Sequence, residues 1–540
     1  MQDRKPLPVT VLSGFLGSGK TTLLRHILQS PDHGLRIAVI VNDMAAINID
    51  ANLILRPSNL PRKEKDSTTE TAEIRVTEKV VKMQNGCICC TLRGDLLVEL
   101  ARLAWSDQKF DHIVIESSGI SEPQQVAETF TTELTEAMVD AEGMEIDEKE
   151  TFIQVAKLGG LKSLTTIDTM VTVVDAFRFF SEFSTTDFLV DRFGKDSVPD
   201  EDQRTISDLF ADQIEFANVI VINKLDLVDK HTLGRVRAYV KALNPVAKIV
   251  EARYSKVDVR EVLGTGVFDF AEAVASPGWL RSLHEMTVVD VQGKKRVAPK
   301  PETLEYGIGS FVYRARRPFD PTKLYKALEG NFILLQDELE FDDDEDDDED
   351  MSDVASSSSQ HSPTASNSDR LTSSSEEDEI PPSQILANKS SSPLFNGLHR
   401  SKGIFWLATR PFQMGSWSTA GAMLTLGSEM PWFCQIPDED WNADEETMRN
   451  IQADFEGEWG DRRQELVFIG ERLDVKGLTG MLDGCLLNEE EMGLWEGVMR
   501  EDGVVEVEKE ERLGEVWDDE WWGEWPRFED GESGEHSHQH

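Results

Sequence analysis

Three of the chain's five cysteines stand within four positions, in the segment Asn85-Gly86-Cys87-Ile88-Cys89-Cys90. The leucines after this segment recur at helical spacing, and the start of a helix lowers the pKa of nearby thiols. Thiolates bind soft ions such as Zn²⁺. A closed structural zinc site takes four ligands, usually from two separated pairs, whereas this segment offers three. Cys87, Cys89 and Cys90 are therefore predicted to bind zinc and to leave one coordination position open for exchange.

Two other interpretations of these cysteines stay open. The thiols could be small apolar residues of the core, although three cysteines directly after Asn-Gly make a poor core pattern. Cys87 and Cys90 also form a C-x-x-C pair, which could work as a reversible disulfide switch. The other two cysteines, Cys434 and Cys485, are expected to be structural.

A glycine-rich segment near the start of the chain fits the phosphate-binding pattern G-x-x-x-x-G-K-[ST]. It lies between an apolar strand pattern and a helical pattern, which is the context that this motif requires. Backbone N–H groups of such a loop surround phosphates, while the lysine reaches the terminal phosphates and the hydroxyl binds Mg²⁺. The predicted phosphate-binding residues are Gly14, Gly17, Ser18, Gly19, Lys20, Thr21 and Thr22, with Thr21 as the Mg²⁺ ligand.

A second nucleotide motif, Asn223-Lys224-Leu225-Asp226, follows the predicted strand Val219 to Ile222. Ligands of open α/β sheets bind at this end of the strands. The Asp226 carboxylate can accept hydrogen bonds from N1–H and the 2-amino group of guanine, a pair of donors that adenine lacks. Asn223, Lys224 and Asp226 are therefore predicted to bind guanine, so that the nucleotide is GTP or GDP.

Acidic residues between the two motifs could complete the site. A predicted strand from His112 ends at Glu116, and Gly119 follows three residues later. This spacing suits a carboxylate that holds Mg²⁺ through water and a glycine N–H that contacts the γ-phosphate. Lys20, Glu116 and Gly119 are accordingly the predicted catalytic residues, and Asp43 could help to hold Mg²⁺ or a transferable metal.

The elements that position these motifs read as a parallel α/β sheet. Six apolar runs are short, β-branched and nearly continuous, which is typical of strands buried on both faces. Helical patterns lie between several of them. The predicted strands are Leu7 to Leu12, Arg36 to Val41, Val80 to Met83, His112 to Ile115, Met170 to Val174 and Val219 to Ile222. The polar stretches 56–72 and 131–162 are expected to be loops or lids.

The rest of the chain predicts a second, smaller α+β domain. The expected divisions are a P-loop GTPase domain over 1–255, a linker over 256–302, and a C-terminal domain over 303–336 and 399–500. The acidic, serine-rich insert 337–398 is expected to be disordered because it cannot bury enough apolar surface to offset chain entropy. The stretch 501–540 reads as an acidic tail whose closing histidines, at His536, His538 and His540, are expected to be solvated.

The formal net charge of −46 excludes some partners. From residue 337 to 380 the chain has 18 acidic residues against one basic, and from 501 to 540 it has 15 against three. Non-specific nucleic-acid binding needs the opposite charge, so no nucleic-acid partner is expected. No apolar run approaches the length of a membrane span, and the first residues lack a signal-peptide pattern. A cytoplasmic or nuclear location follows by default, where clustered cysteines indicate metal or redox chemistry.

Taken together, the motifs resemble the CobW-type GTPases, which are relatives of the GTPases that insert nickel into urease and hydrogenase. The resemblance covers nearly the whole chain outside the acidic insert and the tail, and the C-terminal segments look most like the zinc-responsive subgroup of zinc chaperones. The matching segments are GFLGSGKTT at Gly14, VNDM at Val41, NGCICC at Asn85, ESSGISEP at Glu116, DTMVTVVDA at Asp168, DQIEFANVIVINKLD at Asp212, GSFVYRARRPF at Gly309, KGIFWLATRP at Lys402 and GDRRQELVFIG at Gly460.

The resemblance implies a GTP-hydrolysing metallochaperone that delivers a metal, zinc in preference to cobalt, to client metalloproteins. Related sequences usually carry a glutamate shortly after the N-D pair, where this chain has Ala45-Ala46-Ile47, so a carboxylate ligand at that place is in doubt. We expect GTP and the thiolate-bound metal to alter each other's affinity. A function of another class also stays open, namely a nucleotide-gated interaction scaffold with a structural metal ion.

Overall fold

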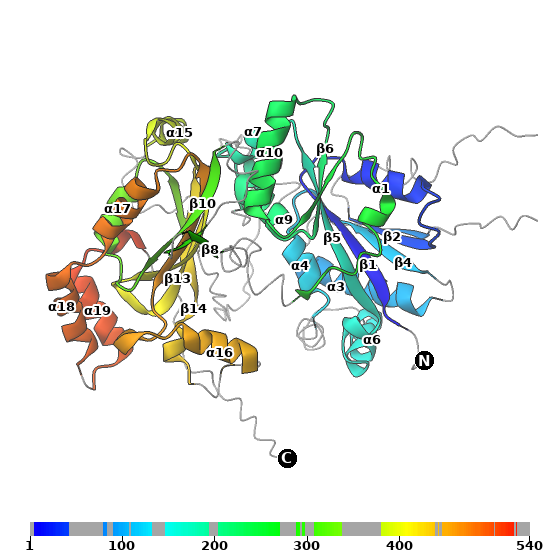
Figure 1. The fold of residues 1–540 in the computed structure, drawn as a ribbon. Coiled ribbons are helices and arrows are strands. Elements are labelled where there is room, and N and C mark those ends of the chain that lie inside the picture. The colour runs from blue at the N-terminus through cyan, green and yellow to red at the C-terminus, as the bar shows by residue number, and fades with distance from the viewer. Residues whose placement is uncertain are drawn as a thin grey trace, which may run out of the picture.

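The chain forms two adjoining domains, shown in Figure 1. The computed structural model describes residues 5–42, 79–83, 90–106, 110–131, 146–193, 204–270, 288–291, 294–297, 307–336, 380–437, 441, 445–501, 503–522 and 525. Within these ranges, none of the helices combines the length and the apolar character that crossing a membrane requires.

The N-terminal domain is built on a seven-stranded sheet in the order β3-β2-β4-β1-β5-β6-β7. Every pair of neighbouring strands is parallel. The six strands predicted from the sequence are confirmed, five of them to within one residue at each end, while β5 starts five residues earlier than predicted. The half-exposed edge strand β7 is an addition. The strands are β1 (Leu7–Ser13), β2 (Ile37–Asn42), β3 (Lys79–Met83), β4 (His112–Glu116), β5 (Thr165–Asp175), β6 (Val219–Asn223) and β7 (Lys248–Glu251).

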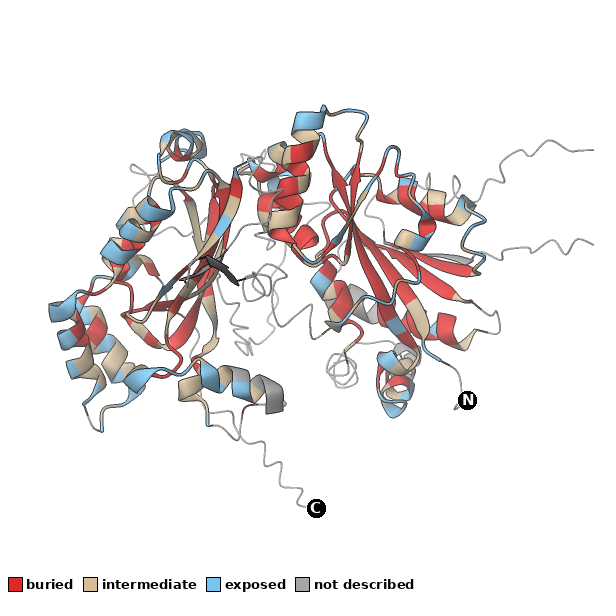
Figure 2. Cartoon of the chain, in the orientation of Figure 1, coloured by how far each residue is buried: buried red, intermediate tan, exposed pale blue. Residues whose placement is uncertain are grey.

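Helices cover both faces of this sheet, which explains why its strands are apolar along their length (Figure 2). Helix α1 (Lys20–Gln29) packs on one face, together with residues from Ala252 to Leu263. The other face carries helices α3, α4, α6, α9 and α10. Their bounds, with those of two short helices after β5, are α3 (Cys90–Trp105), α4 (Pro123–Glu128), α6 (Ile146–Lys157), α7 (Phe179–Phe183), α8 (Leu189–Phe193), α9 (Ile206–Glu215) and α10 (Lys230–Leu243).

Two segments of this domain differ from expectation. Helix α6 lies inside the stretch 131–162 that was predicted to be a loop or lid, and its Phe152 and Val155 are buried against the sheet. Their spacing of three residues puts both on one helix face. Residues 256–270, predicted as linker, pack on the same domain, because the Asp168 carboxylate accepts hydrogen bonds from the backbone N–H of Thr265 and Gly266. Two 3₁₀ turns, η1 (Leu161–Ser163) and η2 (Val259–Glu261), complete these segments.

The C-terminal domain is built on a six-stranded sheet in the order β10-β15-β12-β13-β14-β11. All its pairs are antiparallel except β11 with β14. Its strands are β10 (Ile308–Ala315), β11 (Ile333–Gln336), β12 (Leu398–Leu407), β13 (Arg410–Ala420), β14 (Met423–Pro431) and β15 (Gln464–Glu471). A separate hairpin pairs β8 (Val288–Val291) with β9 (Lys294–Val297).

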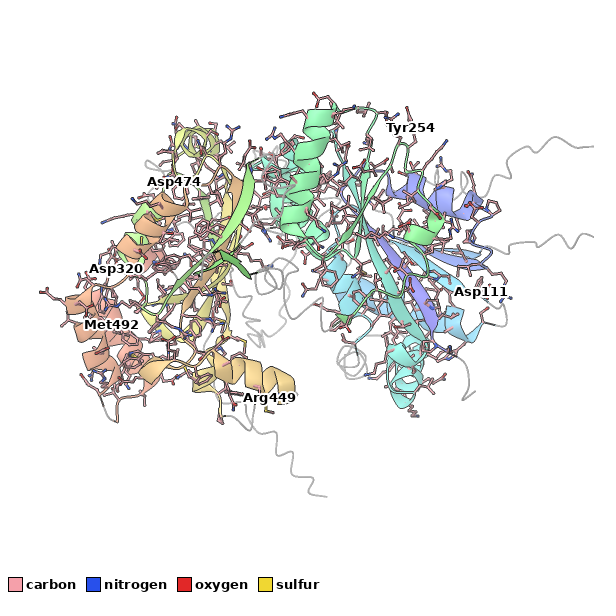
Figure 3. The ribbon with its side chains drawn as sticks, viewed as in Figure 1. Asp111, Tyr254, Asp320, Arg449, Asp474 and Met492 are labelled. Atoms are coloured by element: carbon pink, nitrogen blue, oxygen red, sulfur yellow. The ribbon has the colours of Figure 1, made fainter. Side chains whose placement is uncertain are left out.

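Helices α14 (Pro321–Leu328) and α17 (Val475–Cys485) pack on this sheet through Leu324, Leu328, Leu478 and Leu482. Asp320 caps α14, as the Asp-Pro start predicts. The other helices and 3₁₀ turns are α15 (Pro382–Ser391), α16 (Glu445–Ala453), α18 (Glu489–Met499), α19 (Glu506–Val516), η3 (Phe433–Gln435), η5 (Gly457–Trp459) and η6 (Glu520–Trp522). Figure 3 labels Asp320, the N-cap of α14, and Met492 in α18.

Two predictions about low-complexity segments need correction. Helix α15 falls inside the stretch 337–398 that was predicted to be disordered, and its Ile385 and Lys389 are buried. The acidic composition that supported that prediction ends at Glu379, and the more apolar residues after it can pack. The stretch from 501, predicted as an acidic tail, contains α19 and buries Leu513, Trp517 and Trp522. The large apolar area of the indole rings outweighs the surrounding charge.

The two domains share one buried apolar cluster. Ile308, Ala420, Val467 and Ile469 of the C-terminal sheet belong to the same buried cluster as the residues of α9 and α10. Beside it, the Ser207 hydroxyl donates to the Ala420 carbonyl at 3.1 Å. The two domains therefore bury a continuous core between them.

The buried His112 offers a test of this fold. Its Nε2 lies 2.8 Å from the Thr10 hydroxyl, and burial lowers its pKa to about 4. The unfolded chain then binds a proton that the folded chain rejects, so stability is full above pH 6.5 and is lost as the pH falls towards 4. Between pH 7 and 5.5 the parent protein should lose roughly 1 kcal/mol more free energy of unfolding than the His112→Gln variant. Urea titrations at both pH values measure the difference. His231→Gln, at an exposed histidine, is the control and should follow the parent; identical losses in the parent and His112→Gln would contradict the prediction.

Candidate functional site

The predicted phosphate-binding loop joins β1 to α1, and its glycines are required by its conformation. Gly14 has φ of +127°, and a Cβ there would lie 2.2 Å from the Val173 carbonyl oxygen. Gly19 has φ of +115°, and a Cβ there would lie 2.4 Å from Nδ2 of Asn223. Residues with a side chain rarely adopt such φ values. The glycines thus allow the loop to close against β5 and against the start of the guanine motif.

Lys20 and Thr21 open helix α1 at the rim of the loop. The ammonium group of the buried Lys20 donates to the carbonyls of Gly14 at 2.6 Å and Phe15 at 3.3 Å. The Thr21 hydroxyl donates to Oε1 of Glu116 at 2.5 Å. Glu116 ends β4 and is 5% exposed. The structure therefore brings together the lysine, the hydroxyl and the carboxylate that the sequence predicted to share one site.

Gly119 lies in the loop that follows β4 and fits closely against the phosphate-binding loop. A Cβ on Gly119 would lie 2.6 Å from Cγ and 2.8 Å from the backbone nitrogen of Leu16. Ser117 ties the same loop to β1, because its hydroxyl donates to the Leu12 carbonyl at 3.0 Å. The loop after β4 is therefore in direct contact with the phosphate-binding loop and with β1.

The guanine motif follows β6, and its first residue braces the phosphate-binding loop. The Asn223 amide donates to the Ser18 carbonyl at 2.9 Å and to the Ser255 hydroxyl at 2.8 Å. Lys224 has φ of +62°, and its ammonium pairs with Oδ2 of Asp175 at 2.6 Å. Asp226 is exposed, so its carboxylate is accessible to a base. Of the remaining predicted residues, Gly17 and Thr22 are exposed on the loop and on α1.

Two residues of this site were missed from the sequence. Ser255 donates its hydroxyl to the Gly19 carbonyl at 2.9 Å and its backbone N–H to Oδ1 of Asn223 at 2.9 Å. Asp175 ends β5 as Glu116 ends β4, and a carboxylate at a strand end was the signal that could have revealed it. Ser255 follows the edge strand that was not predicted, so no pattern pointed to it. Its neighbour Tyr254 is 67% exposed on the surface of the N-terminal domain (Figure 3).

Of the predicted metal-binding residues, Thr21 and Glu116 lie in the described part of the chain, whereas Cys87, Cys89 and Asp43 lie outside it. The terminal histidines, expected to be solvated, also lie outside it. Cys90 begins α3, but its side chain is not among those described. The part of the chain that the structure describes contains no group of three or more His, Cys, Asp or Glu residues that could hold a metal ion. The zinc site and the role of Asp43 therefore stay predictions.

Comparisons with known proteins agree with this arrangement. The family model "CobW/HypB/UreG, nucleotide-binding domain" matches residues 8–157 and 146–251. The model "Cobalamin synthesis protein cobW C-terminal domain" matches residues 376–486. The Zinc-regulated GTPase metalloprotein activator 1 of Dictyostelium discoideum is 38% identical over 92% of this chain and 82% of its own length.

Other relatives match the chain over shorter stretches or with weaker similarity. The Zinc chaperone CobW of Sinorhizobium sp is 31% identical over 48% of this chain, which spans 63% of that protein. The crystal structure of Zn(II)-bound YjiA GTPase from E. coli aligns with 90% of this chain and 100% of its own, at 16% identity and a TM-score of 0.30. The matched domains and the extended match to the Dictyostelium protein decide the question: the chain belongs to the CobW/HypB/UreG family and is a P-loop GTPase.

Proposed function

We propose that this GTPase is a zinc metallochaperone, which binds Zn²⁺ through Cys87, Cys89 and Cys90 and transfers it to a client metalloprotein as the nucleotide turns over. The names of its relatives support zinc handling: one is a zinc-regulated activator of metalloproteins and another a zinc chaperone. The chemistry of the segment supports the ligands, because three thiols in one short stretch suit a soft ion held with an open position.

One observation carries the link between metal and nucleotide, namely the register of strands β3, β2 and β4. Asn42 pairs with Met83, and Val41 pairs with Glu116. The strands are parallel, so their carboxyl ends, at Asn42, Met83 and Glu116, lie at the same edge of the sheet. Neighbouring strands lie about 4.8 Å apart, which puts the end of β3 roughly 10 Å from the end of β4. The cysteine segment, Asn85 to Cys90, begins two residues after Met83 in the sequence, and the nearness of the ends of β3 and β4 supports a coupling between its metal and the nucleotide.

The residues of the site have different roles in GTP hydrolysis. The loop from Gly14 to Thr21 binds the phosphates, and Lys20 places a positive charge at the terminal phosphates. The Thr21 hydroxyl oxygen and Oε1 of Glu116 lie 2.5 Å apart, and both are hard oxygen ligands of the kind that Mg²⁺ prefers. When bound, Mg²⁺ neutralises charge that develops on the phosphates. The N–H of Gly119 contacts the γ-phosphate, so the loop after β4 distinguishes GTP from GDP.

Nucleotide and metal then affect each other through the loops that leave this edge. GTP orders the residues after β2, β3 and β4, which favours zinc binding, and hydrolysis relaxes them and lets the client's ligands take the ion. Such coupling is reciprocal. Zinc is preferred to cobalt because of the named functions of the relatives, since thiolates alone accept both ions.

The role of Asp226 can be tested by changing nucleotide specificity. In Asp226→Asn an amide replaces the carboxylate, so one acceptor for guanine is exchanged for a donor. Affinity for GTP should fall by about 10- to 100-fold, whereas affinity for XTP, which has a carbonyl at the 2-position, should rise. Fluorescent nucleotide titrations measure both constants. Asp229→Asn is the matched control, because Asp229 is the N-cap of α10, where asparagine serves equally well. A variant that kept the GTP preference would show that Asp226 does not read the base.

The coupling can be tested by zinc titration. Zinc should bind about 5- to 150-fold more tightly with a non-hydrolysable GTP analogue than with GDP. Affinity should weaken as the pH falls, because the thiols must be deprotonated to bind. The variant Cys87→Ser, Cys89→Ser, Cys90→Ser should lose tight zinc binding and keep nucleotide binding, while Cys434→Ser should retain both. Equal zinc affinities in the two nucleotide states would end the proposed coupling, though not the GTPase.

Transfer is a separate step and needs its own measurement. Zinc loaded with GTP should pass to a fluorescent zinc chelator in proportion to GTP hydrolysed, because hydrolysis relaxes the site. The parent protein loaded with zinc and a non-hydrolysable GTP analogue should hold its zinc over the same period. Zinc that stays bound through many rounds of hydrolysis would instead favour a nucleotide-gated scaffold with a structural ion.

A further inference from the structure

Helix α9 contacts the loop that follows β4. The side-chain amide of Gln213 is fully buried, and its Nε2 donates to the carbonyls of Gly119 at 3.2 Å and Ser121 at 3.1 Å. The carbonyl oxygen of the same amide has no hydrogen-bond partner within the described residues. The two loop carbonyls therefore determine how this amide is oriented, because the opposite orientation would face oxygen against oxygen.

The loop after β4 is consequently held from two sides. Leu16 of the phosphate-binding loop lies against Gly119 so closely that a Cβ would not fit. Gln213 holds the carbonyl of the same residue from α9. The helix is itself tied to the sheet, because the Thr172 hydroxyl donates to the backbone carbonyl of Gln213 at 2.6 Å. A shift of α9 must therefore change how Gly119 sits relative to the phosphate-binding loop.

The opposite end of this connection is Arg400, on strand β12 of the C-terminal domain. Its guanidinium is 1% exposed and faces three carboxylates of α9 at spacings of four and three residues. Nη1 lies 2.8 Å from Asp208, Nη2 lies 2.9 Å from Asp212, and Nε lies 2.9 Å from Glu215. Burial alone would lower the pKa of Arg400, but the carboxylates of Glu215, Asp212 and Asp208 raise it above its ordinary value.

The same guanidinium is also fixed within its own sheet. Nη1 donates to the Ser418 hydroxyl at 3.1 Å and to the Thr419 carbonyl at 3.3 Å. The N–H donors of a planar guanidinium point in fixed directions. Because Arg400 binds α9 on one side and its own sheet on the other, it fixes how the helix and the sheet are oriented to each other. The C-terminal sheet therefore fixes the rotation of α9 about its axis, and with it the position of Gln213.

We propose that Gln213 is a positioning residue for GTP hydrolysis, and that Arg400 sets its position from the C-terminal domain. Gln213 acts through Gly119, whose N–H meets the γ-phosphate, and the inference rests on that proposed role of Gly119. GDP lacks the γ-phosphate, so displacing Gly119 should lower the affinity for GTP and the rate of turnover but not the affinity for GDP. The C-terminal domain thereby influences the rate of hydrolysis without touching the nucleotide.

The first test uses full-length Gln213→Met, which removes both donors and keeps the length and burial of the side chain. Turnover (kcat) should fall by about 10- to 100-fold, the order expected when a group near the reacting atoms is misplaced. Affinity for a non-hydrolysable GTP analogue should fall, while affinity for GDP stays at the parent value. A purely structural role for Gln213 would lower both affinities together or neither.

The second test uses Arg400→Lys, which keeps the charge and loses the planar fork. It should lower kcat with GDP affinity unchanged, and in combination with Gln213→Met it should cause no further loss, since both act on one loop. Arg235→Met is the matched control. It removes the ion pair between Arg235 and Glu471 at 2.9 Å, which crosses the same interface from α10, and it should turn over GTP like the parent.

The outcomes separate this inference from the role of Gly119. Gly119→Ala should abolish turnover; unchanged turnover there would overturn the assignment of Gly119 and this inference with it. Loss of turnover in Gly119→Ala but not in Gln213→Met would overturn this inference alone. If the fold losses of kcat in Gln213→Met and Arg400→Lys multiply in the double variant, the two residues act independently and the proposed connection is wrong. If Gln213→Met does not fold, Arg400→Lys decides by the same comparison of GTP-analogue and GDP affinities.

Discussion

Parallel pairing of the seven strands is the constraint on which the rest of the site depends. It brings the carboxyl ends of β4, β5 and β6 to one edge, so that Glu116 lies beside Thr21 and Asp175 lies beside Lys224. These residues are far apart in sequence and meet because of register. The glycine-rich loop can use this edge only because Gly14 and Gly19 approach the backbone and side chains of β5 and β6 more closely than any other residue could.

The boundary between the domains combines two kinds of contact with different effects. The apolar cluster shared by α9, α10 and the C-terminal sheet supplies area, which stabilises association without fixing direction. The ion pairs of Arg400 have the opposite effect: burying its guanidinium with the carboxylates of Asp208 and Glu215 is costly, but the geometry of the cluster admits few arrangements. The hairpin between β13 and β14 adds a close approach at Gly421, where a Cβ would lie 2.1 Å from the Phe183 carbonyl.

Much of the nucleotide site could be predicted from sequence because its signals are local. The glycine-rich loop and the guanine motif each lie within eight residues, directly after an apolar strand. Ser255, Gln213 and Arg400 could not be found in this way, since each acts through a partner at least 30 residues distant. Acidic composition led to the wrong prediction for α15 and for Trp517 and Trp522, because an average over an acidic stretch hides the few apolar residues that pack.

Helix α15 determines how the acidic insert is attached. Asn388 donates its amide to the Gly330 carbonyl at 2.8 Å, so the helix that follows the insert packs against the turn that leads into β11, the strand that precedes the insert. Because β11 and α15 belong to the same domain, the entropic cost of joining them grows only as the logarithm of the length of the chain between them. Additions, deletions or charge changes between β11 and α15 can therefore accumulate over evolution at little cost to the domain that carries them.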